Sequence, residues 1–88
     1  MHEQSLMNDL MAKILTIAKE NGGKRVVAVD VWLGALSHMS AAHFAEHYHH
    51  SAMGTIAEGA RLDTELSDDI DHPDANHILL RSVEVENE

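Results

Sequence analysis

Cysteine is absent from this chain of 88 residues. Without thiols the protein cannot form disulfides, present a thiolate nucleophile, or build a zinc or iron–sulfur site on cysteine ligands. Any metal that it binds must therefore be held by nitrogen and oxygen atoms, and we expect no structural zinc.

Long apolar runs are absent as well. No segment approaches the roughly 20 consecutive apolar residues that a membrane-spanning helix needs. Residues 1–9 lack the basic cluster of a secretory signal, and Lys13 interrupts the apolar positions that follow. The sequence thus predicts a cytoplasmic protein with no membrane contact.

Basic residues are few. Six Lys and Arg stand against 15 Asp and Glu, which gives a formal net charge of −9. Such a charge repels phosphate backbones and anionic lipid surfaces. We therefore expect no nucleic-acid partner, and cations or a basic protein surface are favoured instead.

Signatures of catalysis are also missing. The sequence has no glycine-rich phosphate loop and no serine accompanied by an identifiable base and oxyanion hole. We therefore do not expect an enzyme.

Two stretches have the features of helices. In residues 6–20 the apolar positions recur every three or four residues, with Ser5 as the expected N-cap and the glycines of residues 21–23 as the stop. A second helix should start at a cap provided by Ser37 or Ser40 and continue to about residue 51.

Three stretches have the features of strands. Residues 24–33 are rich in β-branched side chains, and residues 60–66 alternate between apolar and polar. An acidic loop at 67–76 then leads to the last expected strand, residues 77–85. The order α-β-α-β-β predicts a single α+β domain over residues 1–88, a three-stranded sheet with two helices packed on one face. The expected core residues are Leu10, Ile14, Ile17, Val27, Val29, Val31, Leu62, Ile78 and Leu80.

The chain opens Met1-His2-Glu3, followed by an amphipathic helix. This opening, together with segments 23–26, 33–37, 54–62 and 79–85 in the same order, resembles the HypA/HybF family of nickel metallochaperones for hydrogenase maturation. The resemblance implies the fold described above and a nickel(II) site formed by the Met1 amine, the His2 amide and imidazole, and the Glu3 amide.

One departure from the family is large. The family inserts a zinc domain with two Cys-x-x-Cys pairs between its second and third strands, whereas here residues 67–76 make the connection without cysteine. The chain therefore resembles a short form of the family, and functions that depend on the zinc domain are not implied. We expect the loop to be mobile and tolerant of substitution.

The N-terminus has a physical reason to bind nickel that is independent of the resemblance. The α-amine, two backbone nitrogens and the His2 imidazole lie in one short segment and can form small chelate rings around one ion. Nickel(II) and copper(II) favour square-planar nitrogen sets, whereas zinc(II) prefers tetrahedral sites. The alternative interpretation is an ordinary chain terminus without a site.

His43, His47 and His50 lie at i, i+4 and i+7 of the second predicted helix. This spacing places three imidazoles along one face, where they could bind a divalent ion or receive one in transit. A solvated helix face, with some imidazoles stacked on Phe44 or Tyr48, is the competing interpretation.

The acidic loop and its flank offer one more set of potential ligands. It consists of Asp68, Asp69, Asp71, His72, Asp74 and His77. The set lacks the spacing of a calcium-binding loop, and charged runs usually form solvated connections.

Two functions remain open. The first is a nickel-binding maturation factor, for which the resemblance implies a HypB-type nickel GTPase or the large subunit of a nickel–iron hydrogenase as partner. The second is a metal-free interaction or scaffold module in hydrogenase maturation. The sequence leaves open whether the chain is a monomer or a homodimer.

Overall fold

The computed structural model describes the backbone of residues 2–87 and the side chains of residues 4–87. Its elements follow the predicted order: α1 (His2–Glu20), β1 (Arg25–Leu33), α2 (Ala41–Ala52), β2 (Arg61–Leu66) and β3 (Ile78–Glu86). Within this described part, no helix is long and apolar enough to cross a membrane.

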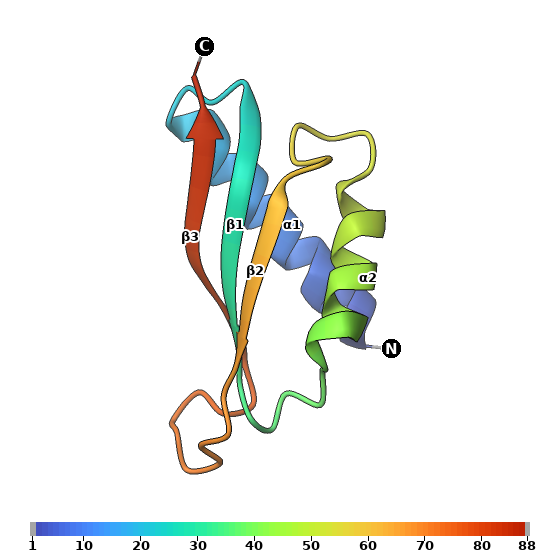
Figure 1. Ribbon diagram of the computed structural model, residues 1–88, viewed down its shortest axis with the longest axis vertical. Coiled ribbons are helices and arrows are strands. Elements are labelled where there is room, and N and C mark those ends of the chain that lie inside the picture. Colours follow the sequence, from blue (N-terminus) through green and yellow to red (C-terminus); the bar gives the residue numbers. More distant parts are fainter. Residues whose placement is uncertain (1, 88) are drawn as a thin grey trace.

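The strands form one mixed sheet in the order β2-β1-β3. The central strand β1 pairs in parallel with β2 and antiparallel with β3. Figure 1 shows α1 crossing diagonally behind the strands, with α2 beside it and next to β2. The two helices and the three-stranded sheet confirm the predicted α+β fold.

Helix α1 begins earlier than predicted and ends as predicted. It starts at His2, so Ser5 lies inside the helix and is not its cap. A side-chain hydrogen bond from Gln4 to Asn8, 2.9 Å long, supports this polar first part. At the other end Gly22 has φ 69°, and the Gly23 N–H donates to the Ala18 carbonyl at 2.8 Å, which is the pattern of a Schellman C-cap.

The start of α2 is fixed by Ser40. Its side chain accepts a hydrogen bond from the His43 N–H at 3.1 Å, as expected for an N-cap, which decides between the two predicted caps.

The core lies between the helices and one face of the sheet. Most predicted residues contribute to it, but Ile17 and Val27 are only partly buried and lie outside the core cluster. The buried face of α1 is shifted around the helix toward Met7 and Met11. Among the described residues, the buried core cluster comprises Met7, Leu10, Met11, Ile14, Ala18, Val26, Val29, Val31, Leu33, Met39, Phe44, Tyr48, Ala52, Ala57 and Ala60.

The prediction that Val27 belongs to the core is wrong because β1 has a bulge. Val26 pairs with Val85, yet Ala28 pairs with Glu84, so Val27 is an additional residue in β1. The extra residue reverses the alternation of buried and exposed side chains at the start of β1. Val26 therefore takes the buried position expected for Val27 and is 1% exposed.

The loop after β2 crosses the end of β1. Leu66 and Ile78 both pair with Leu33, one on each side, so the loop connects the two outer strands of the sheet at the same end. The Ser67 N–H donates to the Leu33 carbonyl at 2.9 Å, and the Gly34 N–H donates to the His77 carbonyl at 2.9 Å. A short loop, residues 67–77, therefore joins β2 to β3.

Candidate metal-binding site

The N-terminal site falls at the edge of what the structure describes. Met1 lies outside the described residues, and His2 and Glu3 are described only as the backbone of the first turn of α1. This backbone is informative, because the N–H groups of a helical first turn have no acceptor within the helix. The amide nitrogens of His2 and Glu3 are thus not used by the helix that they begin.

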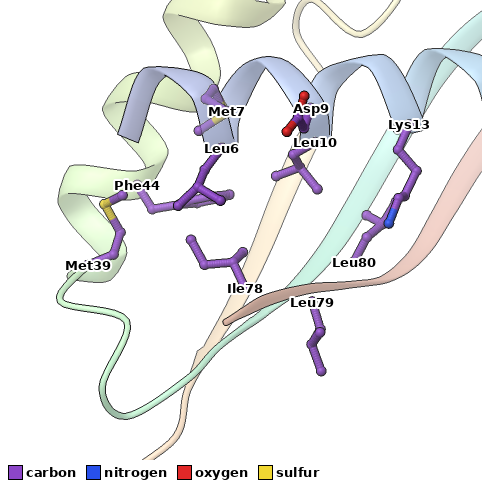
Figure 2. Close-up of a pocket in the computed structure, with 10 residues that line it drawn as sticks. All are labelled: Leu6, Met7, Asp9, Leu10, Lys13, Met39, Phe44, Ile78, Leu79 and Leu80. Carbon is purple, nitrogen blue, oxygen red and sulfur yellow. The ribbon is translucent and has the colours of Figure 1, made fainter. Parts of the chain in front are cut away.

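The beginning of α1 packs against the beginning of α2. An apolar pocket of about 360 Å³ lies beneath this part of α1, and both helices and β3 line it. Figure 2 shows Leu6 and Met7 of α1 beside Phe44 of α2 and Met39 just before it, with Ile78 of β3 below. The end of α1 that carries His2 is consequently close to the first turn of α2.

Of the three histidines predicted on α2, two are in contact. The ring centroids of His43 and His47 are 4.6 Å apart, with 55° between the ring planes. His43 and His50 are exposed and His47 is half-buried. Among the residues that the structure describes, no group of three or more potential ligands is arranged to hold a metal ion.

The expected stacking of imidazoles on the aromatic residues involves a different histidine. His49 makes an edge contact with Tyr48 at 5.5 Å. The spacing of His43, His47 and His50 could not identify this contact, because His49 lies on another side of the helix.

The acidic side chains of the loop mainly organise its turns. The Asp71 N–H donates to the Asp69 carboxylate at 3.0 Å, and the Asp74 N–H donates to Nδ1 of His72 at 2.9 Å. His77 Nδ1 lies 3.4 Å from the Asp74 carboxylate. Several of the potential ligands therefore stabilise turns within the loop.

His72 has a second contact that the sequence did not indicate. Its ring packs on Trp32 of β1, with centroids 4.8 Å apart, on the sheet face opposite the helices. Arg81 of β3 lies on the same face and contacts Glu65 of β2 and, at 3.2 Å, Asp30 of β1. The hydrogen bond to Glu65 is the main reason that the pKa of Arg81 is raised.

His38 is exposed in the turn between β1 and α2. Its φ of 61° places it in the left-handed region, which non-glycine residues seldom adopt.

The arrangement of helices and strands matches that of two solved structures. The chain matches the solution structure of the Ni metallochaperone HypA from Helicobacter pylori with a TM-score of 0.81 at 21% identity, covering all of both chains. A second solution structure, described as HypA protein, has a TM-score of 0.77 at 22% identity and covers 100% of this chain and 98% of that one. At these identities the likeness establishes the fold.

The sequence comparisons establish the family. Residues 1–69 match the family model for hydrogenase/urease nickel incorporation, metallochaperone, hypA. The hydrogenase maturation factor HypA of Rhizobium leguminosarum bv. viciae is 35% identical over 63 residues, which are 72% of this chain and 56% of that protein. The same factor of Chlorobaculum tepidum is 31% identical over 62 residues, 70% of this chain and 55% of that protein.

The chain therefore belongs to the HypA family of metallochaperones for nickel incorporation. It spans little more than half the length of these two relatives. The family match ends at residue 69, inside the loop between β2 and β3.

Proposed function

We propose that this protein is a nickel-binding maturation factor, which delivers nickel to, or regulates nickel for, a nickel enzyme such as a nickel–iron hydrogenase. The observation that carries the proposal is the match of residues 1–69 to the nickel-incorporation family, because the matched segment includes Met1-His2-Glu3. Nickel is the cargo in this function and must be released again.

The proposed nickel ligands are the Met1 amine, the His2 amide and imidazole, and the Glu3 amide. The helical start at His2 supports this set, since binding at these amides breaks no hydrogen bond within the helix. A helical ψ angle of about −42° also keeps the amide nitrogens of neighbouring residues on the same side of the backbone. Both nitrogens can then belong to one small chelate ring. A square-planar nitrogen set of this kind favours nickel(II) over zinc(II).

The proposed partner is a HypB-type nickel GTPase or the large subunit of a nickel–iron hydrogenase. The two curated relatives are named hydrogenase maturation factors, which supports a partner within that process. This chain has no cysteine, so contacts made through a cysteine zinc site have no counterpart here. Partner recognition is assigned to the α+β domain itself.

Calorimetric titration of the untagged protein with nickel(II) tests the nickel site. We expect one ion to bind to the N-terminus, and we expect acetylation of the α-amine or His2→Ala to abolish that binding. The complex should be diamagnetic with a weak yellow absorption, because a low-spin d⁸ ion in square-planar geometry has no unpaired electrons. The matched control is the triple replacement of His43, His47 and His50 by alanine, which should retain the diamagnetic signal.

Two results would contradict the assignment. If the triple replacement removes all tight nickel binding while acetylation has no effect, the N-terminal ligand set is wrong. If the unmodified protein binds no nickel through a free N-terminus, the metal-free interaction module becomes the better function.

A further inference from the structure

The sheet face opposite the helices carries apolar side chains at the end where residues 67–77 join β2 to β3. Trp32 and Leu79 are directly paired between β1 and β3, so their side chains lie on the same face. The ring of His72 packs on Trp32, with centroids 4.8 Å apart. Leu79 is 37% exposed, and Figure 2 shows its side chain pointing away from α1. We refer to Trp32, His72 and Leu79 as the Trp32 patch.

The loop next to this patch is strongly acidic. Residues 67–77 contain four aspartates and neither Lys nor Arg. Asp68, Asp69 and Asp71 are exposed, and no Lys, Arg or His of the described residues forms an ion pair with them. The Asp69 carbonyl accepts a hydrogen bond from the His72 N–H at 3.3 Å, and Asp71 directly precedes His72. These three aspartates therefore form an acidic edge beside the Trp32 patch.

The arginines of the two outer strands do not neutralise this edge. Arg81 of β3 contacts Glu65 and, at 3.2 Å, Asp30. Arg61 of β2 lies 3.0 Å from the Asp63 carboxylate. Both arginines are thus paired within the sheet, and the acidic edge keeps its negative charge.

We propose that the Trp32 patch and the acidic edge form a docking surface for a basic segment of a partner protein, in which Lys or Arg side chains flank an apolar residue. The apolar residue packs on Trp32 and Leu79, and the flanking cations pair with the carboxylates of the acidic edge. An Arg guanidinium of the partner would also be attracted to the face of the Trp32 indole.

Charge decides between the possible occupants of this surface. A second copy of the chain would bring another acidic edge against the first, and like charges that face each other across an interface oppose binding. Phosphate groups of nucleic acids and anionic lipid headgroups are repelled in the same way. A basic protein segment complements both the patch and the edge. The surface contains none of the proposed nickel ligands, so this inference goes beyond the proposed nickel function.

The surface is already formed in the folded chain. The Asp74 N–H donates to Nδ1 of His72 at 2.9 Å, which fixes the ring that packs on Trp32. The Leu36 N–H donates to the Ala75 carbonyl at 2.8 Å and attaches the following part of the loop. Because these groups are held in place before a partner arrives, binding requires little further ordering.

The fluorescence of Trp32 tests the surface directly, since it is the one tryptophan of the chain. The probe is a synthetic lysine-rich peptide with a single leucine at its centre, titrated into full-length protein without added metal. We expect a saturable change in Trp32 emission, and the affinity should fall as salt is added, because salt screens exposed charges. The same peptide with glutamate in place of lysine should not bind.

Replacement of the three aspartates of the acidic edge by asparagine tests the charge. This triple variant should bind the lysine peptide about tenfold more weakly, because three exposed ion pairs of modest strength are lost together. The matched control neutralises three exposed acidic residues of the helices, Asp9→Asn, Glu20→Gln and Glu46→Gln. It changes the net charge by the same amount and should leave the affinity nearly unchanged.

Leu79→Ser tests the apolar part of the surface. It should weaken binding by about fivefold, because the leucine of the peptide loses an apolar contact. Ile56→Ser is the matched control, since Ile56 is 39% exposed but lies outside the surface. Circular dichroism of each variant verifies that the fold is retained.

The wild-type protein alone can overturn the proposal. NMR spectra with the lysine peptide should show the largest amide shifts at Trp32, Leu79 and residues 68–72, and largest shifts in the helices would place the binding elsewhere. If the control variant of the helices weakens binding as much as the variant of the acidic edge, only the net charge attracts the peptide and the surface is refuted. If sedimentation shows a dimer that Leu79→Ser converts to a monomer, the occupant is a second copy and the basic segment is wrong.

Discussion

The hydroxyl group of Tyr48 illustrates how one polar atom can lower the stability of a small core. Tyr48 is 0% exposed, and its hydroxyl has no hydrogen-bond partner among the described residues. A buried hydroxyl without a partner loses its interactions with water and gains nothing in exchange, at a cost of about 1–3 kcal/mol. The ring itself packs against Phe44, with centroids 6.4 Å apart, and stabilises the contact between α2 and the core.

We therefore expect Tyr48→Phe to raise the free energy of unfolding by about 1 kcal/mol, because it removes the hydroxyl and retains the ring. Chemical denaturation at neutral pH measures the change. Tyr48→Leu is the control, since it also removes the hydroxyl but leaves a cavity and should be destabilising. A less stable Tyr48→Phe variant would indicate that the hydroxyl has a partner in the folded protein.

The same residue should make the protein sensitive to alkali. Burial raises the pKa of Tyr48 above its usual value of 10.0, so the folded state keeps the phenol proton longer than the unfolded chain does. Below the usual pKa, the phenol is protonated in both the folded and the unfolded state, and the folded protein keeps its full stability. As the pH rises from there through the folded-state pKa, the unfolded chain ionises first and the stability falls. Since the chain has one tyrosine, this alkaline loss should be smaller in Tyr48→Phe, as denaturation at several pH values would measure.

At the level of structural elements, the loop of residues 67–76 depends on Gly34. A Cβ atom added to Gly34 would overlap with the carbonyl oxygen of Ala75. Ala75 is 3% exposed, and its carbonyl accepts a hydrogen bond from the Leu36 N–H at 2.8 Å. The second half of the loop is thus attached to the end of β1, and tolerance of substitution is expected only around Asp68 to Asp71.

Gly34→Ala should therefore detach this part of the loop and lower the free energy of unfolding by about 1–3 kcal/mol. Hydrogen exchange measured by NMR should show faster exchange of the Leu36 N–H. Ala75→Gly in the same chain is an informative control, because the overlap is with the backbone oxygen and the smaller side chain cannot relieve it. Unchanged exchange in Gly34→Ala would mean that the loop is not held by this contact.

Features set by local chemistry were predictable from the sequence, and those set by pairing were not. The Gly22 C-cap and the Ser40 N-cap follow from the residues themselves. The bulge at Val27 is different, because it depends on how β1 pairs with β3. The irregular pairing at Arg81 likewise keeps both Leu80 and Val83 against the core, which no pattern within β3 alone indicates.

The candidate metal sites show the same division. The spacing of His43, His47 and His50 predicted a shared helix face, but it could not tell which two rings meet, because that depends on side-chain rotamers. The N-terminal ligand set was predicted from the chelating groups of one short segment and from the family resemblance, and the match over residues 1–69 shows the family. The structure contributes the helical start at His2, which leaves the amide nitrogens unused.

For the whole molecule, the net charge and the proposed ligands would have separate parts in binding nickel. The net charge of −9 draws cations toward the protein. At physiological ionic strength, however, salt screens this attraction at distances beyond about 8 Å. Affinity and selectivity must then come from the nitrogen ligands themselves. Since those ligands bind protons as well as metal, the protein should hold nickel in a strongly pH-dependent way.

We expect nickel to be released on mild acidification. An imidazole and an α-amine have reference pKa values of about 6.5 and about 7.8, so protons compete with the ion for both groups near neutrality. Titrations with nickel(II) at about pH 8 and about pH 6 should show a large loss of affinity at the lower pH. Asp and Glu carboxylates remain ionised throughout this range, so binding that is equal at both pH values would assign the nickel to carboxylates and exclude the N-terminal site. Repeating the titrations on acetylated protein separates the α-amine from the imidazoles of α2, because only the N-terminal component should disappear.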